Sequence, residues 1–254
     1  MQLNRLCSEL NELLGVESFV DIDISPNGLQ VGPEIATIDR VAFAVDAAAA
    51  TIEAAIEADA DLLVTHHGLW LDGPDYLTGH HFNRVSRLIE GELALYVSHL
   101  PLDAHPELGN AAGVADLIDL QQREEFGQYD GDQIGQCGQL ATSTSRSKIA
   151  DILEAQLVGV RDIHLLPFGP DPVDSVAIVT GSGVDWLEEA VSIEADLFIT
   201  GEGKQHLYHE AREAEINVLM AGHYATETTG IRSLATVLEE WGLETTVIDH
   251  PTGL

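Results

Sequence analysis

The sequence predicts an α/β protein built from two pseudo-symmetric α/β repeats. Strand-like apolar runs alternate with helical stretches along the 254 residues. The second half also resembles the first. "VAFAVD" (41–46) corresponds to "VAIVTG" (176–181), and "EAAIEADADLLVTHHG" (53–68) corresponds to "EEAVSIEADLFITGEG" (188–203), each 135 residues later. A spacing that recurs over several segments indicates a duplicated structural unit.

A third pair of segments completes the repeat. "LYVSHLPLD" corresponds to "VLMAGHYATE", which places His99 and His223 in register, 124 residues apart. We therefore expect a first repeat at 1–125 and a second at 126–254, facing each other around a central cleft. Because ligands in such sheets gather at the carboxyl ends of strands, we expect the polar groups there to make this a metal cleft.

Local patterns predict the elements of the first repeat in chain order. An opening amphipathic helix ends at Gly15, since glycine readily takes the left-handed conformation of a helix C-terminus. "NGLQVG" at 27–32 predicts a turn. The elements that follow are a strand at 41–46, a helix at 47–58, a strand at 61–65, a polar loop at 66–80, a helix at 81–92, a strand at 93–99 and a helix at 111–120. The polar, glycine-bearing stretch 121–140 is predicted to be a boundary or crossover.

Charge is the strongest compositional signal. Asp and Glu number 43 against 11 Lys and Arg, giving a net charge of −32, while hydrophobic content stays at 45%. This combination predicts a folded chain with a repulsive acidic surface, typical of halophilic proteins, although an acidic partner-binding surface is an alternative. Nucleic-acid binding is disfavoured because no basic patch would neutralise phosphates. With only Cys7 and Cys137, and no apolar signal or spanning segment, we expect a cytoplasmic protein that does not bind membranes.

The candidate functional residues lie at corresponding strand ends of the two repeats. They comprise imidazoles, carboxylates and one glycine, in the aligned sets His66-His67 with Gly201-Glu202, and His99-x-x-x-Asp103 with His223-x-x-x-Glu227. Adjacent strand residues point to opposite faces, so His66 and His67 would not chelate one ion comfortably within a regular strand. At the strand's end each ring can serve a different ion instead.

The mixture of donors indicates the class of metal. Imidazole with carboxylate suits zinc, iron, manganese, cobalt or nickel, whereas calcium prefers an oxygen-only shell. Carboxylates such as Asp103 and Glu227 can bridge or cap two ions. Two ions about 3.5–4 Å apart are the usual centre of dinuclear hydrolases. The rival explanations are a buried, hydrogen-bonded histidine, a helix-capping Asp103 and a first-turn helix acid at Glu227.

Five ordered motifs resemble those of a known family. "NGLQVG", "LLVTHHG", "SHLPLDAHPELGN", "ADLFITGEG" and "AGHYATETTGIRSL" are similar to the motifs of the Nif-three-like dinuclear metal proteins, also called GTP cyclohydrolase 1 type 2 homologs. The resemblance runs from about residue 4 to 250 and is to the short form, without the extra inserted domain. It implies two divalent ions per chain, and a homohexamer with metal sites facing an internal cavity. The ligands implied, with Glu227 bridging both ions, are His66, His67, Asp103, His223 and Glu227.

Two further residues have expected supporting roles. His99 is the counterpart of His223 but is not among the family's five ligands, so we expect it to orient a ligand. Glu202 occupies the place of His67 and is expected to orient a ligand or act as a general base. No catalytic residue is assigned.

The resemblance implies a hydrolase that opens the purine ring of GTP with release of formate. Its small-molecule substrate would be GTP or another nucleotide. Two alternatives use the same ligands: a non-catalytic metal-binding, metal-delivery or regulatory protein, and a phosphoester hydrolase. Ligand identity does not choose among the three, and it does not fix the metal, because first-row ions share these donors.

Overall fold

The computed structural model describes residues 1–33, 36–70 and 76–254, which form two compact units. Unit 1 comprises Met1–Leu102 with Ile231–His250, and unit 2 comprises Asp103–Gly230 with Pro251–Leu254. These bounds differ from those of the repeats predicted at 1–125 and 126–254, because the chain returns to the first unit near its C-terminus. The division into repeats stays a prediction about the sequence, and the predicted α/β class is confirmed.

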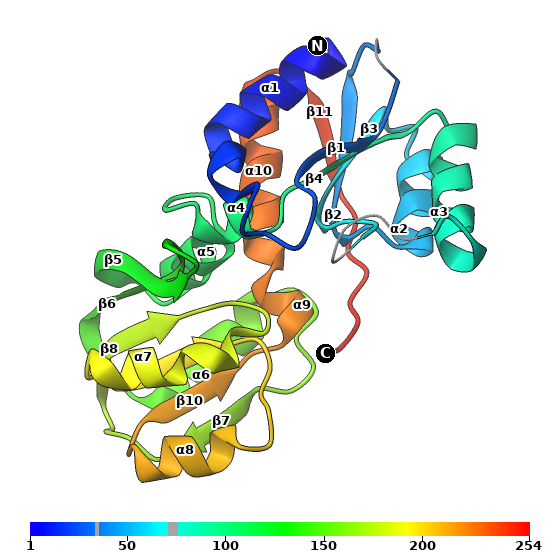
Figure 1. Cartoon of the computed structure of the whole chain (residues 1–254). Coiled ribbons are helices and arrows are strands. Elements are labelled where there is room, and N and C mark those ends of the chain that lie inside the picture. Colours follow the sequence, from blue (N-terminus) through cyan, green and yellow to red (C-terminus); the bar gives the residue numbers. More distant parts are fainter. Residues whose placement is uncertain (34–35, 71–75) are drawn as a thin grey trace. The chain divides into compact units, whose positions relative to one another are not determined.

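Unit 1 is built on a five-stranded mixed sheet in the order β1-β4-β3-β2-β11. Its strands are β1 (Gly28–Val31), β2 (Arg40–Asp46), β3 (Leu62–His67), β4 (Ala94–Val97) and β11 (Glu244–Val247). All neighbours pair in parallel except β1, which is antiparallel to β4. In Figure 1 the red strand β11, from near the C-terminus, joins the blue strand β2 from the first fifth of the chain.

The helices of unit 1 are α1 (Leu3–Leu14), the 3-10 helix η1 (Val16–Phe19), α2 (Ala49–Glu57), α3 (Gly79–Glu90), and most of α10 (Thr228–Glu240), whereas α4 (Leu100–Ala104) spans the division between the units. Three of these helices, α1, α2 and α3, are predicted from the sequence, whereas η1, α4 and α10 are not. Helix α1 ends where expected, with Gly15 in the left-handed conformation at φ 62°. It buries Leu3, Leu6 and Leu10 completely, which fixes its apolar face in the core.

One prediction in unit 1 is wrong. Residues 28–31 of "NGLQVG" form strand β1 rather than a turn, with Gly28 opposite Val97 and Leu29 opposite Tyr96. The strand exists through its pairing with β4, a distant partner that local turn propensity does not report. The polar loop predicted at 66–80 includes residues 71–75, which lie outside the described residues.

Unit 2 is built on a six-stranded mixed sheet in the order β5-β6-β8-β9-β10-β7. Its strands are β5 (Leu120–Tyr129), β6 (Asp132–Thr144), β7 (His164–Pro167), β8 (Val173–Ile178), β9 (Leu197–Thr200) and β10 (Asn217–Met220). Its helices are α5 (Asn110–Leu117), α6 (Arg146–Gln156), η2 (Gly183–Trp186), α7 (Leu187–Ser192), α8 (Leu207–Glu213) and α9 (His223–Thr226). Strands β8, β9 and β10 are parallel.

The stretch 121–140, predicted to be a boundary or crossover, lies instead in the antiparallel hairpin β5–β6. Its polar residues lie mainly on exposed positions, while Phe126 and Ile134 are buried at 2% and 5% exposure. Asp130 and Gly131 turn the hairpin with positive φ angles of 46° and 111°. Polar composition here marks a solvated strand face, not an interdomain link.

The repeated sequences form corresponding strands in the two sheets. In each case three parallel strands follow one another, β2, β3 and β4 in unit 1 and β8, β9 and β10 in unit 2. The register is conserved as well, since Val41 pairs with Leu62 in one sheet and Val176 with Leu197 in the other. Parallel strands end at the same edge of a sheet, so each unit gathers its strand-end residues together.

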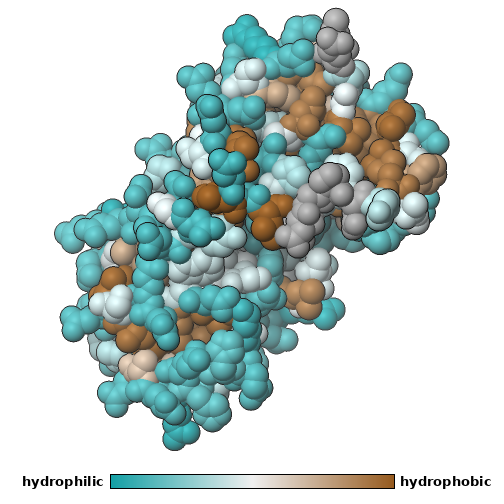
Figure 2. All heavy atoms as spheres, in the orientation of Figure 1, coloured by the Kyte–Doolittle hydropathy of each residue, from teal (hydrophilic) through white to brown (hydrophobic). Residues whose placement is uncertain are grey.

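The visible surface of the molecule is mostly polar, since hydrophilic side chains cover most of the face seen in Figure 2. Among the described residues, every helix is too short or too polar to cross a bilayer.

Candidate metal centre

Three imidazoles converge at the carboxyl ends of strands β3 and β4 in unit 1. His66 and His67 end β3, and His99 follows β4 by two residues. The ring centroids lie 4.7 Å apart for His66 and His67, 5.1 Å for His66 and His99, and 5.7 Å for His67 and His99. One nitrogen from each ring lies within 4.8 Å of the other two, so the three rings form a group that could hold a metal ion.

The adjacent rings therefore do not diverge as regular strand geometry predicts. Two hydrogen bonds explain the difference. His66 Nδ1 lies 3.0 Å from the carbonyl oxygen of Ser98, and His67 Nδ1 lies 2.9 Å from Asp46 Oδ1. Each anchor comes from the neighbouring strand end, so the sheet edge holds both rings in one cluster.

These anchors also fix which nitrogen can bind an ion. A carbonyl oxygen only accepts, so His66 donates through Nδ1, and a neutral ring then keeps its lone pair at Nε2. An ionised Asp46 imposes the same tautomer on His67, and Asp23 Oδ1, 2.8 Å from His99 Nδ1, imposes it on His99. Histidines that bind metals nearly always donate their other ring N–H to a carbonyl or carboxylate. The cluster has this arrangement three times.

Unit 2 combines an imidazole with carboxylates. His223 begins α9 and Glu227 follows that helix, so the two side chains lie on one face, with His223 Nε2 3.1 Å from Glu227 Oε1. His223 Nδ1 lies 3.2 Å from Glu202 Oε1, and Ser182 Oγ donates to the same Glu202 oxygen at 2.7 Å. Glu202 therefore contacts His223 at Nδ1, and its two expected roles stay predictions.

The electrostatics of this group favour positive charge. Burial alone would lower the pKa of His223, but the hydrogen bonds and negative charges of Glu227 and Glu202 outweigh it and raise that pKa to about 9. The ring therefore carries a proton at neutral pH between two carboxylates. Glu227 is only 4% exposed, so its charge is poorly screened by water.

Glycines let the backbone approach these side chains. At Gly181, where φ is +58°, a Cβ atom would collide with Glu227 Oε1. At Gly201 it would lie 2.7 Å from the Cα of His223. Gly201 therefore permits close approach of the backbone to His223.

Asp103, the remaining predicted ligand, lies in α4 at the start of unit 2. Its Oδ1 accepts hydrogen bonds from Asn110 Nδ2 at 2.8 Å and Thr180 Oγ1 at 3.3 Å. Asn110 is fully buried and itself accepts from the backbone N–H of Gly230 at 3.0 Å. Asp103 is thus held by a rigid polar neighbour instead of capping the helix that follows. Its role as a ligand, like that of the other four, stays a prediction.

Sequence reasoning missed the acidic residues that hold the histidines. Asp46 ends strand β2, 135 residues before Gly181 in the repeat, so its strand-end position could have identified it. Asp23 lies in the loop between η1 and β1, outside the aligned segments of the repeat, and no sequence pattern identifies it.

The donor set fits the metals predicted from the sequence. Unit 1 offers imidazole nitrogens, and unit 2 offers imidazole with carboxylate oxygen. Nitrogen-rich sites of this kind bind zinc, iron, manganese, cobalt or nickel and disfavour calcium.

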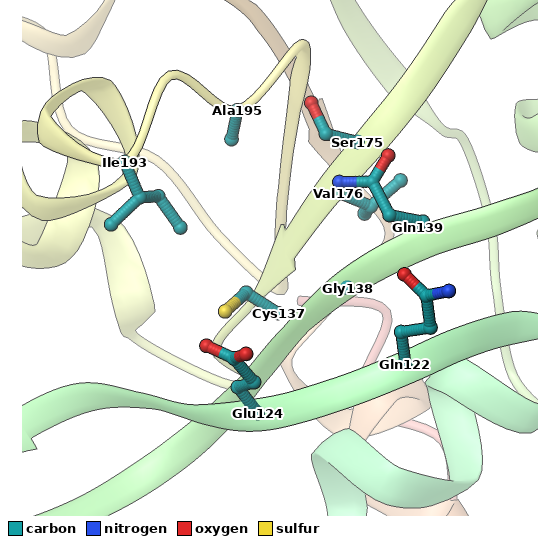
Figure 3. A pocket seen from close by; sticks show the side chains of 9 residues that line it. All are labelled: Gln122, Glu124, Cys137, Gly138, Gln139, Ser175, Val176, Ile193 and Ala195. Carbon is teal, nitrogen blue, oxygen red and sulfur yellow. The ribbon is translucent and has the colours of Figure 1, made fainter.

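A separate pocket of about 240 Å³ lies over β5, β6 and β8 of unit 2. Figure 3 shows its lining, in which Glu124 and Cys137 supply the only carboxylate and thiol. Burial, then the negative charges of Glu124 and Glu189, raise the pKa of the Cys137 thiol, which makes it a poor ligand at neutral pH. The nine described residues of the lining include no imidazole and none of the predicted site residues, so this pocket is distinct from the histidine cluster.

Comparison with known proteins identifies the family. Residues 1–253 match the family Duf34/NIF3 (NGG1p interacting factor 3). The chain is 52% identical to the GTP cyclohydrolase 1 type 2 homolog of Halobacterium salinarum and 41% identical to that of Pyrococcus abyssi, with 100% of both chains covered in each case. The crystal structure of the protein TTHA1606 from Thermus thermophilus is 38% identical and has a TM-score of 0.91, again over 100% of both chains. The chain therefore belongs to the Duf34/NIF3 family.

Proposed function

We propose that this protein is a metal-dependent hydrolase that opens the purine ring of GTP, or of another nucleotide, and releases formate. The five predicted ligands would hold two divalent ions, and they are His66, His67, Asp103, His223 and Glu227. The main support is the histidine cluster of unit 1, in which an oxygen holds every Nδ1 and the neutral ring then carries its lone pair at Nε2. Relatives named GTP cyclohydrolase 1 type 2 homologs support the reaction class.

The chain's own residues prepare such a centre. Asp46 and the carbonyl of Ser98 orient His67 and His66, while Ser182 and Glu202 orient His223. Bound divalent ions would supply Lewis acidity and an activated water at neutral pH. Pre-oriented ligands bind with less loss of side-chain entropy, because their rotamers are already fixed.

The direct test is formate release. Protein loaded with Zn²⁺, Fe²⁺, Mn²⁺, Co²⁺ or Ni²⁺ is incubated with GTP in molar salt, and formate is measured beside elemental analysis of the protein. We expect formate from the wild type and from Gln139→Ala, whose side chain lines the separate pocket of unit 2, but not from His67→Ala. Formate from His67→Ala at the wild-type rate, or none from any loaded sample, would overturn the proposal.

A non-catalytic metal-binding, delivery or regulatory role is the second candidate. The net charge of −32 favours it, because at low salt the surface attracts divalent cations and repels nucleoside triphosphates. A delivery protein should transfer its ion to an apo acceptor within the mixing time, whereas a hydrolase should retain it through turnover. A phosphoester hydrolase uses the same ligands, and a phosphoester screen beside the GTP assay separates it.

We also propose a homohexamer, on the strength of family membership. Sedimentation equilibrium should give six times the 27.4 kDa of one chain. A monomer at micromolar concentration in molar salt would contradict it.

A further inference from the structure

We propose that Asp23 positions His99 as a third metal-binding imidazole of unit 1, an inference that rests on the proposed metal centre. Sequence reasoning gave His99 only an orienting role and gave Asp23 none. The structure supports reversing this order, so that Asp23 orients and His99 binds.

Asp23 is a buried carboxylate with a complete set of donors. Its side chain is 0% exposed. Oδ1 accepts from His99 Nδ1 and from the Ser25 backbone N–H, each at 2.8 Å. Oδ2 accepts from Asn27 Nδ2 at 2.8 Å and from the Leu100 backbone N–H at 3.0 Å. Four donors stabilise the ionised form of a buried acid and leave it little freedom to rotate.

The same loop holds His99 at a second point. Asn27 Oδ1 accepts the backbone N–H of His99 at 2.7 Å, while its Nδ2 donates to Asp23. Backbone and ring of His99 are therefore both fixed by a loop more than 70 residues earlier in the chain. This fixes the ring's direction and, through Nδ1, its tautomer.

The ring of His99 lies where it can contribute to metal binding. Nε2 is the nitrogen of His99 that Asp23 leaves available. The ring lies beside His66 and His67, and one nitrogen of each of the three rings lies within 4.8 Å of the other two. His99 is 18% exposed and His67 21%, so an ion can reach the cluster from solvent. A histidine retained only for packing would have no reason to share both its tautomer and its location with two others.

The repeat supplies independent support. His223, the counterpart of His99, also has its Nδ1 against a carboxylate, Glu202. The two carboxylates come from unrelated places, since Glu202 follows β9 and Asp23 lies before the first of the aligned segments, in the loop between η1 and β1. Equivalent histidines thus receive the same support by different routes, which indicates that the carboxylate–histidine arrangement itself matters.

The test is Co²⁺ binding, followed by visible absorption and by titration of the purified full-length chain. We expect Asp23→Asn and His99→Gln each to weaken Co²⁺ binding about 10–100-fold and to change the ligand-field bands. Because Asp23 acts through His99, the double variant should bind no more weakly than His99→Gln alone. Asp61→Asn is the matched control, since Asp61 also accepts two backbone N–H groups, from Asp39 and Arg40, and lies outside the cluster.

The outcomes distinguish failure of this inference from failure of the proposed metal centre. Wild type that binds Co²⁺, with unchanged binding and spectrum in His99→Gln, overturns the inference and leaves the proposed function standing. Additive losses in the double variant assign Asp23 a purely structural role and also overturn it. If Asp23→Asn does not fold by circular dichroism, His99→Gln alone decides. Wild type that binds no Co²⁺ overturns both.

Discussion

The two units offer a metal ion different environments. Unit 1 presents three imidazoles whose direction is set by hydrogen bonds to Ser98, Asp46 and Asp23. Unit 2 presents one imidazole in direct contact with two carboxylates, His223 between Glu202 and Glu227. In unit 1 the acidic groups support the ligands, whereas in unit 2 an acidic group is itself a candidate ligand. The repeat therefore keeps functional side chains at equivalent strand ends, while the roles of the acidic residues differ between the two units.

The difference extends to the backbone. Unit 1 carries Asp46 at the end of β2, and unit 2 has Gly181 at the aligned position. Glycine there admits the Glu227 carboxylate to the space beside the chain. Side-chain anchoring in one unit is replaced in the other by close backbone approach, so the two units should respond differently to substitution.

The largest effect is expected at Gly181. Gly181→Ala forces a Cβ into Glu227 Oε1 and also requires alanine at φ +58°. We expect a loss of about 3 kcal/mol in the free energy of unfolding, combining overpacking with left-handed strain. Gly15→Ala is the matched control, because φ is +62° and nothing lies within 4 Å of the added atom, so it should cost only about 1–2 kcal/mol. Equal losses in urea unfolding would show that close approach to Glu227 is unimportant.

The two cysteines report on the units separately. Burial raises the pKa of Cys7 in unit 1 from 9.0 to about 11, so below pH 9 it holds about 100-fold less thiolate than an unperturbed thiol. Cys137 in unit 2 is half-buried, and its pKa is raised less far. Iodoacetamide should therefore modify Cys137 well before Cys7, and both faster as pH rises, because the thiolate is the nucleophile. Mass spectrometry of tryptic peptides measures this, and modification of Cys7 at the rate of Cys137 would contradict the burial argument.

Sequence reasoning found what depends on local pattern and repetition. The doublet His66-His67, the strand ends and the end of α1 at Gly15 all follow from neighbouring residues or from the 135-residue offset. Sequence reasoning did not predict strand β1, because its partner β4 lies more than 60 residues away and the residues of β1 themselves resemble a turn. The hairpin β5–β6 escaped it because polar composition hides a strand with one solvated face.

The histidine anchors could not be predicted for a different reason. Asp23 matters because four donors from its own loop and from the segment after β4 meet at one carboxylate. None of these contacts leaves a periodic trace in the sequence. Sequence patterns thus identified the predicted ligands, whereas only the three-dimensional structure identified the residues that orient them.

A smaller effect is expected from losing the imidazole of unit 2. His223→Ala should weaken metal affinity about tenfold. The loss should appear as lower metal occupancy in elemental analysis after dialysis. The fold should survive, because His223 lies on the short helix that follows β10 and is not a member of the apolar core of unit 2. Circular dichroism should match the wild type, and Tyr208→Ala, an exposed residue of unit 2, serves as the control. Full occupancy in His223→Ala would confine metal binding to unit 1.

The smallest effect is expected from salt, which acts on the surface charge of both units and not on the candidate metal ligands. Acidic residues outnumber basic ones in each unit, so raising NaCl from about 0.1 to 2 M should screen repulsion and raise the free energy of unfolding by about 1 kcal/mol or more. Exposed ion pairs such as Arg5–Glu9 would lose strength, but each contributes little. Because the charge is shared, Cys7 and Cys137 labelling under partial denaturation should slow together as salt rises. Protection of only one thiol would mean that the salt response belongs to one unit, and that the contrast between the units reaches beyond their metal ligands.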